Sequence, residues 1–171
     1  MQTITTLILG IGNSLLTDEG AGIHMLDHLR THYPDFTDIT YLDGGTLSFT
    51  LAPWIEAAEQ LVVIDAAELN ALPGTVEVFE GEALDRFAAK TKRSVHEVSL
   101  GDLLSIARLT ATLPERRALV ALQPGSTDWG TEPSDPVARA LPVAAQRVVN
   151  LLQGWTQQGR QDTVLPRVLP V

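Results

Sequence analysis

The sequence predicts a three-layer α/β sandwich, in which helices cover both faces of a twisted, mostly parallel sheet of about five strands. Short apolar runs alternate along the chain with segments whose apolar residues recur at helical spacing. Several of the runs are bounded by glycine or end in aspartate, as buried strands do where a loop begins. No linker, internal repeat or low-complexity tract divides the 171 residues, so we expect a single domain.

The expected strands differ in how deeply they should be buried. Residues 3–10 and 60–65 are almost wholly apolar, which is typical of central parallel strands. Residues 39–42 form a shorter strand before a glycine-rich loop, and residues 117–123 form the last core strand. Residues 75–79 alternate apolar and polar side chains and should lie at an edge.

Helices are expected between these strands and after the last one. Pro34 should end the first helix, and Pro53 should lie in the first turn of the second or bend it. The tail, residues 159–171, carries two prolines and should be loosely ordered, which leaves residues 1–158 as the folded domain. The expected helices span residues 20–33, 47–58, 81–90, 99–110 and 136–158.

The composition excludes several classes of protein. The formal net charge is −9, from 21 acidic and 12 basic residues, which argues against nucleic acid or an anionic membrane as the main partner. The absence of cysteine excludes disulfides, thiolate metal sites and a cysteine nucleophile. Neither a signal peptide nor a membrane span is indicated, so we expect a cytoplasmic protein.

Three carboxylates are expected at one edge of the sheet. Glu19 follows the first strand, Asp43 ends the second and Asp65 ends the third. Parallel strands bring their carboxyl ends to the same edge, and His96, in a loop before a helix, can reach it. Two carboxylates and an imidazole suit a borderline divalent metal. The alternative is structural, because carboxylates at strand ends often cap helices or bind backbone amides.

The glycines after the first strand also permit a different function. Gly10 and Gly12 look like the start of a dinucleotide-binding motif, with Asp43 where a ribose-binding acid would lie. However, Leu15 occupies the position of the third glycine, and Glu19 would place negative charge near a pyrophosphate. A nonenzymatic nucleotide-binding module on a Rossmann-like sheet is therefore the alternative function.

Other motifs give little support to a site elsewhere. His24, His28 and His32 recur every four residues and share one helix stripe. Two histidines at this spacing can hold zinc, but a solvated helix face is the favoured interpretation. The motifs of serine hydrolases, phosphate-binding loops and H-E-x-x-H peptidases are absent from the sequence.

Several short segments stand in an order and at a spacing that are specific when taken together. They are GIGN and LTDEG within residues 10–20, LDGGT at 42–46, VIDA at 63–66, SVH at 94–96 and the dipeptide Gln123-Pro124. From about Thr6 to about Leu152, the chain resembles the hydrogenase maturation endopeptidases, which process the large subunit of nickel-iron hydrogenases. Spore-protein proteases share that fold, but the D-E-G and S-x-H spacing favours the maturation enzymes.

The resemblance implies a site and a reaction. Glu19, Asp65 and His96 match the family residues that coordinate a metal, and the loop at residues 43–46 should shape the same cleft. That metal is the nickel already held by the substrate, although another divalent metal can substitute. The resemblance thus implies a monomeric, metal-dependent endopeptidase that removes the C-terminal extension of the large-subunit precursor after nickel insertion.

The sequence departs from the family at two places that border the expected cleft. Ser48 stands where relatives often have glycine, and the late loop, residues 125–136, carries Trp129 among prolines and glycines. Trp129 is expected in packing or at an interface. Both departures concern substrate choice more than the reaction. Water is the expected nucleophile, and either Glu19 or Asp65 can serve as general base.

Overall fold

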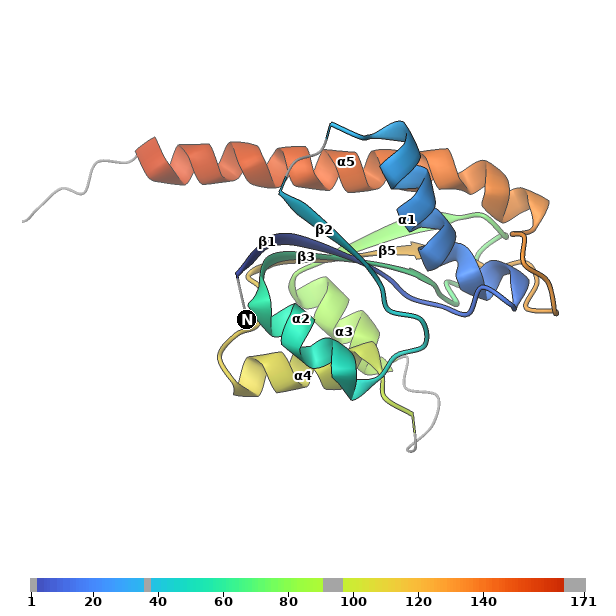
Figure 1. The fold of residues 1–171 in the computed structure, drawn as a ribbon, viewed down its shortest axis with the longest axis horizontal. Coiled ribbons are helices and arrows are strands. Elements are labelled where there is room, and N and C mark those ends of the chain that lie inside the picture. Colours follow the sequence, from blue (N-terminus) through green and yellow to red (C-terminus); the bar gives the residue numbers. More distant parts are fainter. Residues whose placement is uncertain (1–2, 36–37, 91–96, 165–171) are drawn as a thin grey trace, which may run out of the picture.

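The computed structural model describes residues 3–35, 38–90 and 97–164, with side chains described up to Gln158. Within these residues the strands form one sheet in the order β2-β1-β3-β5-β4 (Figure 1). Strand β4 is antiparallel to β5, and all other pairs are parallel. The mostly parallel sheet confirms the predicted fold class. The strands are β1 (Ile4–Gly10), β2 (Ile39–Asp43), β3 (Ala58–Ala66), β4 (Val76–Glu80) and β5 (Arg116–Leu122).

Helices cover both faces of the sheet and complete the three layers. Helices α1 and α5 lie on one face, and α2, α3 and α4 lie on the other (Figure 1). None of the helices in the described part of the chain is long and apolar enough to cross a membrane. The helices are α1 (Ala21–His32), α2 (Ala52–Ala57), α3 (Glu82–Lys90), α4 (Leu100–Leu109) and α5 (Asp135–Val164), with short 3₁₀ helices η1 (Thr17–Gly20) and η2 (Phe49–Leu51).

The central strands contribute side chains to two hydrophobic cores, because successive side chains of a strand point to opposite faces of the sheet. On β1, Leu7 and Leu9 pack with α2, α3 and α4, whereas Ile8 packs with α1 and α5. All three side chains are fully buried. The apolar run in the sequence is thus explained by burial on both faces, as is usual for central parallel strands.

The helix boundaries follow local signals, with two differences from the sequence prediction. Pro53 lies in the first turn of α2, as expected. Helix α2 is shorter than the predicted helix at residues 47–58, because residues 49–51 form the 3₁₀ helix η2 before it and β3 already begins at Ala58. Helix α5 continues to Val164, past the predicted end at Gln158, and accommodates Pro142 in its interior.

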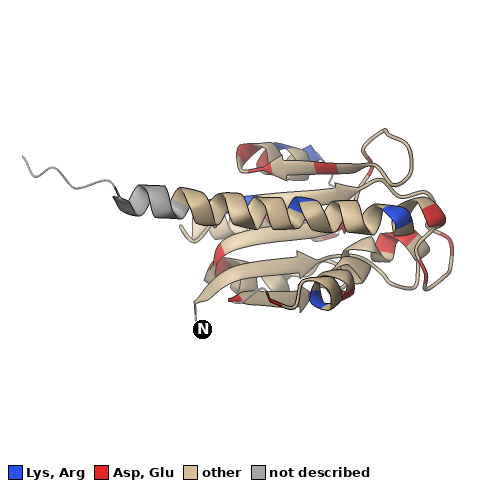
Figure 2. Cartoon of the chain, turned by 90° about the horizontal axis from the view of Figure 1, so that it is seen from above, with Lys and Arg blue, Asp and Glu red and all other residues tan. Residues whose placement is uncertain are grey.

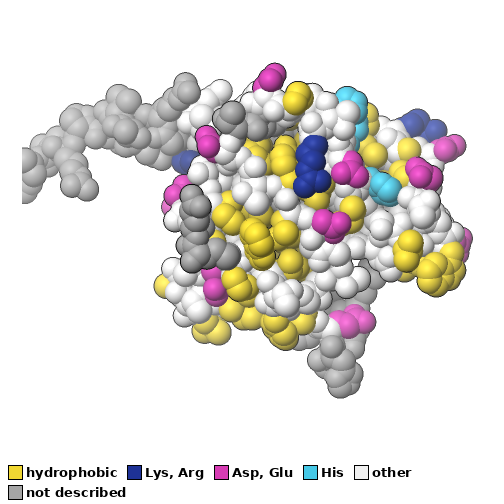
Figure 3. Space-filling model, viewed as in Figure 1, with side chains coloured by type: hydrophobic (Ala, Val, Ile, Leu, Met, Phe, Trp, Pro, Cys, Tyr) yellow, Lys and Arg dark blue, Asp and Glu magenta, His cyan; other side chains and the backbone are white. Residues whose placement is uncertain are grey.

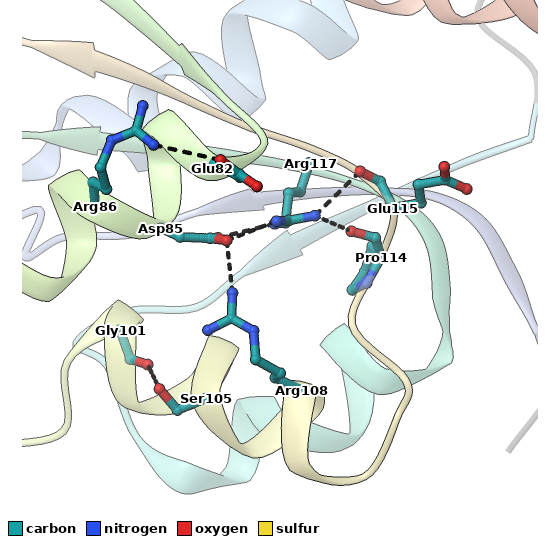
Figure 4. Close-up of polar contacts among 9 residues, drawn as sticks. All are labelled: Glu82, Asp85, Arg86, Gly101, Ser105, Arg108, Pro114, Glu115 and Arg117. Atoms are coloured by element: carbon teal, nitrogen blue, oxygen red, sulfur yellow. Dashed lines mark hydrogen bonds and ion pairs between the residues drawn. The ribbon is translucent and has the colours of Figure 1, made fainter.

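A charged cluster ties three elements together on the face covered by α3 and α4 (Figure 4). Arg117 of β5 donates to Asp85 of α3 through Nε at 2.9 Å and through Nη2 at 2.7 Å. Arg108 of α4 donates to the same carboxylate at 2.6 Å. The Asp85 and Arg117 side chains are only 16% and 11% exposed. The hydrogen bonds from Arg117, followed by the nearby positive charges, hold the pKa of Asp85 below its usual range despite burial.

We predict that Asp85→Asn lowers the free energy of unfolding by about 3 kcal/mol, because it leaves a mostly buried guanidinium unpaired. The matched control is Asp27→Asn, whose exposed ion pair with Arg30 spans 3.6 Å and should contribute less than about 1 kcal/mol. Urea denaturation at neutral pH measures both. Since the pKa of Asp85 is lowered by folding, its contribution should fade as the pH falls below 3.8. Equal losses in the two variants would contradict the prediction.

Candidate active site

The carboxyl ends of the three parallel strands β1, β2 and β3 meet at one edge of the sheet. Gly10 at the end of β1 pairs with Asp43 of β2 on one side and with Ile64 of β3 on the other. Asp65 therefore lies one residue beyond this row. Helix η1, which carries Glu19, packs against β3. The structure thus brings the loop of Glu19 to the end of the strand that carries Asp65, whereas His96 lies outside the described residues.

Glycines allow the chain to turn sharply from β1 to η1. Gly12 has φ +141°, and a Cβ there would lie 1.7 Å from the carbonyl oxygen of Glu19. The neighbouring Asn13 N–H donates to this same oxygen at 3.2 Å. At the start of α1, a Cβ on Gly22 would lie 2.3 Å from the carbonyl oxygens of Ile11 and Ile64. The glycines therefore permit close backbone packing beside Glu19.

The same loop does not offer the free N–H groups that a pyrophosphate needs. The N–H of Ile11 donates to Ile64, and that of Gly12 donates to Gly45. From Ile11 to Glu19, every backbone N–H except that of Ser14 donates to an oxygen of the chain itself. This geometry argues against the nucleotide-binding alternative.

Asp43 has a structural partner instead of a ligand. Its carboxylate accepts the N–H of Gly45 at 2.9 Å, which closes a tight turn after β2. The carbonyl of Gly45 in turn accepts the N–H of Gly12 at 2.8 Å. The loop predicted to shape the cleft therefore contacts the loop that carries Glu19.

Asp18 is the best-anchored acid of this edge, and its side chain is fully buried. One carboxylate oxygen accepts the N–H groups of Gly125 and Ser126 at 2.7 and 2.9 Å and the hydroxyl of Ser134 at 2.7 Å. The other accepts the Ser134 N–H at 2.7 Å. Four hydrogen bonds thus join the loop after β1 to the late loop before α5. The sequence alone assigned no role to Asp18.

These hydrogen bonds determine the charge of Asp18. Burial by itself raises the pKa of its carboxyl group, but the donors from Ser134, Ser126 and Gly125 outweigh that effect and leave the pKa below its usual value. Asp18 is therefore ionised at neutral pH, and the hydrogen bonds that it accepts stabilise the carboxylate form.

A second set of contacts fastens the late loop. Thr17 N–H donates to the carbonyl of Gly130 at 2.9 Å, and Gly130 N–H donates to the carbonyl of Leu15 at 2.9 Å. The Thr17 hydroxyl donates to the carbonyl of Asp128 at 2.7 Å. The two loops therefore run side by side, and the late loop, one of the two departures from the family, is fixed next to the segment that carries Glu19.

Glu19 differs from its neighbour Asp18 both in burial and in hydrogen bonding. It is half-buried, and no hydrogen bond or ion pair within the described residues occupies its carboxylate. Asp65 is half-buried as well. Both side chains offer the oxygen atoms that a divalent metal accepts, or a base for proton transfer. Among the described residues no three acids or histidines form a metal-binding group, and the expected third ligand, His96, falls outside them.

Two further sequence features have structural explanations. The buried amide of Gln123 accepts the N–H of Leu69 at 2.7 Å, so the Gln123-Pro124 motif supports the segment after β3. On α1, the rings of His28 and His32 stack with centroids 4.1 Å apart. Burial, together with the charge of His32, lowers the pKa of His28. Within the described chain, this pair gains no third metal ligand.

We predict that substitutions of the two neighbouring acids change the free energy of unfolding by very different amounts. Asp18→Asn replaces an oxygen acceptor by an amide that faces donors, and should lower the free energy of unfolding by at least about 2 kcal/mol. Glu19→Gln should change it by less than about 0.5 kcal/mol, because no hydrogen bond is lost. Urea denaturation of both variants distinguishes them. Since the pKa of Asp18 is lowered by folding, the difference should shrink as the pH falls below 3.8. A stable Asp18→Asn variant would refute the anchoring role.

Comparisons with known proteins find relatives over most of the chain. A family model described as hydrogenase maturation protease matches residues 23–151. The chain is 34% identical over 150 residues to the hydrogenase expression/formation protein HupD of Rhizobium leguminosarum bv. viciae, covering 87% of this chain and 74% of that protein. It is 36% identical over 126 residues to the hydrogenase 2 maturation protease of Escherichia coli, covering 71% and 74% of the two chains.

Solved structures show the same similarity in three dimensions. The structure of the hydrogenase maturating endopeptidase HybD from E. coli superposes with a TM-score of 0.80 at 30% identity, covering 88% of this chain and 93% of that one. The similarity in sequence and in fold extends over nearly the whole described domain. The chain therefore belongs to the hydrogenase maturation protease family, whose members are peptidases.

Proposed function

We propose that this protein removes the C-terminal extension of a nickel-iron hydrogenase large-subunit precursor after nickel insertion. In this proposal the nickel in the substrate is the recognition signal, and Glu19, Asp65 and His96 supply ligands to it. The main support within the structure is the contrast between Asp18, which accepts four hydrogen bonds, and Glu19, whose carboxylate has no hydrogen-bond or ion-pair partner among the described residues. Family membership supplies the reaction class.

The proposed chemistry uses water as the nucleophile, because the chain has no cysteine and lacks the serine-nucleophile motif. A divalent metal held there by Glu19, Asp65 and His96 would supply Lewis-acid chemistry, polarising the scissile carbonyl and making nearby water more acidic. A carboxylate of Glu19 or Asp65 accepts the proton of the attacking water. The same group then returns the proton to the leaving amine, which releases the C-terminal extension.

We predict that Glu19→Gln, Asp65→Asn and His96→Ala each reduce processing of nickel-loaded precursor at least about 100-fold, as loss of an acid–base or metal-binding group does. The assay is the mass of the large subunit after incubation with nickel-loaded or nickel-free precursor. His32→Ala is the control, because His32 lies exposed on α1 and should leave processing unchanged. Full processing by all three folded site variants would exclude this site.

The turn that positions Glu19 gives a separate prediction. Gly12→Ala would place a Cβ 1.7 Å from the Glu19 carbonyl oxygen, so the loop must move. A displacement of this size should reduce kcat/KM about 100-fold. Gly81→Ala is the matched control, because Gly81 also has a positive φ, +53°, has nothing within 4 Å of its ideal Cβ, and lies before α3, away from this turn. Processing by Gly12→Ala at the rate of Gly81→Ala would contradict the role of this turn.

A further inference from the structure

Two large apolar side chains stand out from the loops beside Glu19. Trp129 of the late loop is 82% exposed, and Leu15 of the loop after β1 is 52% exposed. The hydrogen bond from Gly130 to the Leu15 carbonyl holds the two backbones together. Figure 3 shows hydrophobic side chains gathered at the end of the molecule where these loops lie. We call Leu15 and Trp129 the apolar platform.

The platform stands on an anchored backbone. The Thr17 hydroxyl binds the carbonyl of Asp128, directly before Trp129, and the Asp18 carboxylate binds the loop at Ser126 and Ser134. Because Trp129 is mostly exposed, its side chain adds little to the stability of the fold. Held in place in this way, it can bind a partner with little loss of conformational entropy. Aromatic residues on such preorganised surfaces are typical binding hot spots.

The charges around the platform indicate what kind of segment it binds. The sequence contains no Lys or Arg before Arg30, between Arg30 and Arg86, or between Arg117 and Arg139. The loops after β1, β2, β3 and β5 fall within these gaps, and they carry acids such as Glu68, which is exposed. Figure 2 shows acidic residues on these loops, with basic residues elsewhere on the described chain. Such an edge attracts positive charge, and a tryptophan face can add a cation–π contact.

We propose that the apolar platform anchors a segment of the hydrogenase large-subunit precursor that carries apolar and positively charged side chains. This inference rests on the function proposed above. Leu15 lies four residues before Glu19 in the chain, so the platform is next to the segment that carries the candidate active site. Leu15 and Trp129 thus determine which precursor is bound, and they take no part in the proton transfers.

The first experiment measures processing kinetics of nickel-loaded precursor by Trp129→Ala, Leu15→Ala and the double variant. Loss of hot-spot contacts should raise KM about tenfold for Trp129→Ala and more for the double variant, with kcat unchanged. Leu109→Ala is the matched control, because Leu109 is 88% exposed but lies at the end of α4. Its KM should equal that of the wild type. Urea denaturation checks that all variants are folded.

The second experiment tests the charge of the bound segment. Glu132 lies exposed on the late loop, and Glu59 lies exposed at the start of β3, at the opposite edge of the sheet. Glu132→Lys should raise KM severalfold, whereas Glu59→Lys should not. The wild-type KM should also rise with salt concentration, because salt screens the attraction. Equal effects of the two lysine variants would overturn the charge assignment.

The outcomes separate this inference from the proposed function. If the wild type processes the precursor and the double platform variant has the same KM, the platform is refuted while the function stands. A fall in kcat without a change in KM would likewise refute a docking role. If the wild type processes no nickel-loaded precursor, the proposed function fails, and the docking inference fails with it.

Discussion

The buried carboxylate of Asp18 is the interaction on which the candidate active site depends. It collects four hydrogen bonds from the late loop, whose backbone would otherwise have to satisfy these donors with water. A charged acceptor makes each of these bonds stronger than a neutral one would be. The result is a pair of loops that behave as one unit, with Glu19 on one side and Trp129 on the other.

Two adjacent acids have therefore taken different roles because their surroundings differ. Asp18 faces donors, is buried, and is held ionised at neutral pH. Glu19 is half-buried, and in the described part of the chain its carboxylate has no hydrogen-bond or ion-pair partner. Composition cannot distinguish two such neighbours, since the distinction depends on what the fold places opposite each side chain. Asp18 holds the two loops in a fixed arrangement. The carboxylate of Glu19 is therefore positioned by its neighbour and remains available for the reaction.

The sequence was sufficient to predict the fold and the edge that carries the site. Apolar strands such as β1 show the pattern of burial on both faces, and the carboxyl ends of parallel strands must share an edge. The role of Asp18 could not be predicted, because its partners Gly125 and Ser134 lie 107 and 116 residues away in the chain. The support that Gln123 gives to Leu69 is equally non-local. Such contacts leave no periodic signal in the sequence.

Helix α5 links the anchored loops to the far end of the molecule. It begins at Asp135, directly after Ser134, and its 30 residues extend about 45 Å away from that edge (Figure 1). Its buried residues between Val137 and Trp155 pack in the same core as Ile8 of β1, so the start of the helix is held in place relative to the sheet. Ser134 is thus fixed from two sides, by the helix that follows it and by the carboxylate of Asp18. The loop of Glu19 therefore shares its support with the core of the domain.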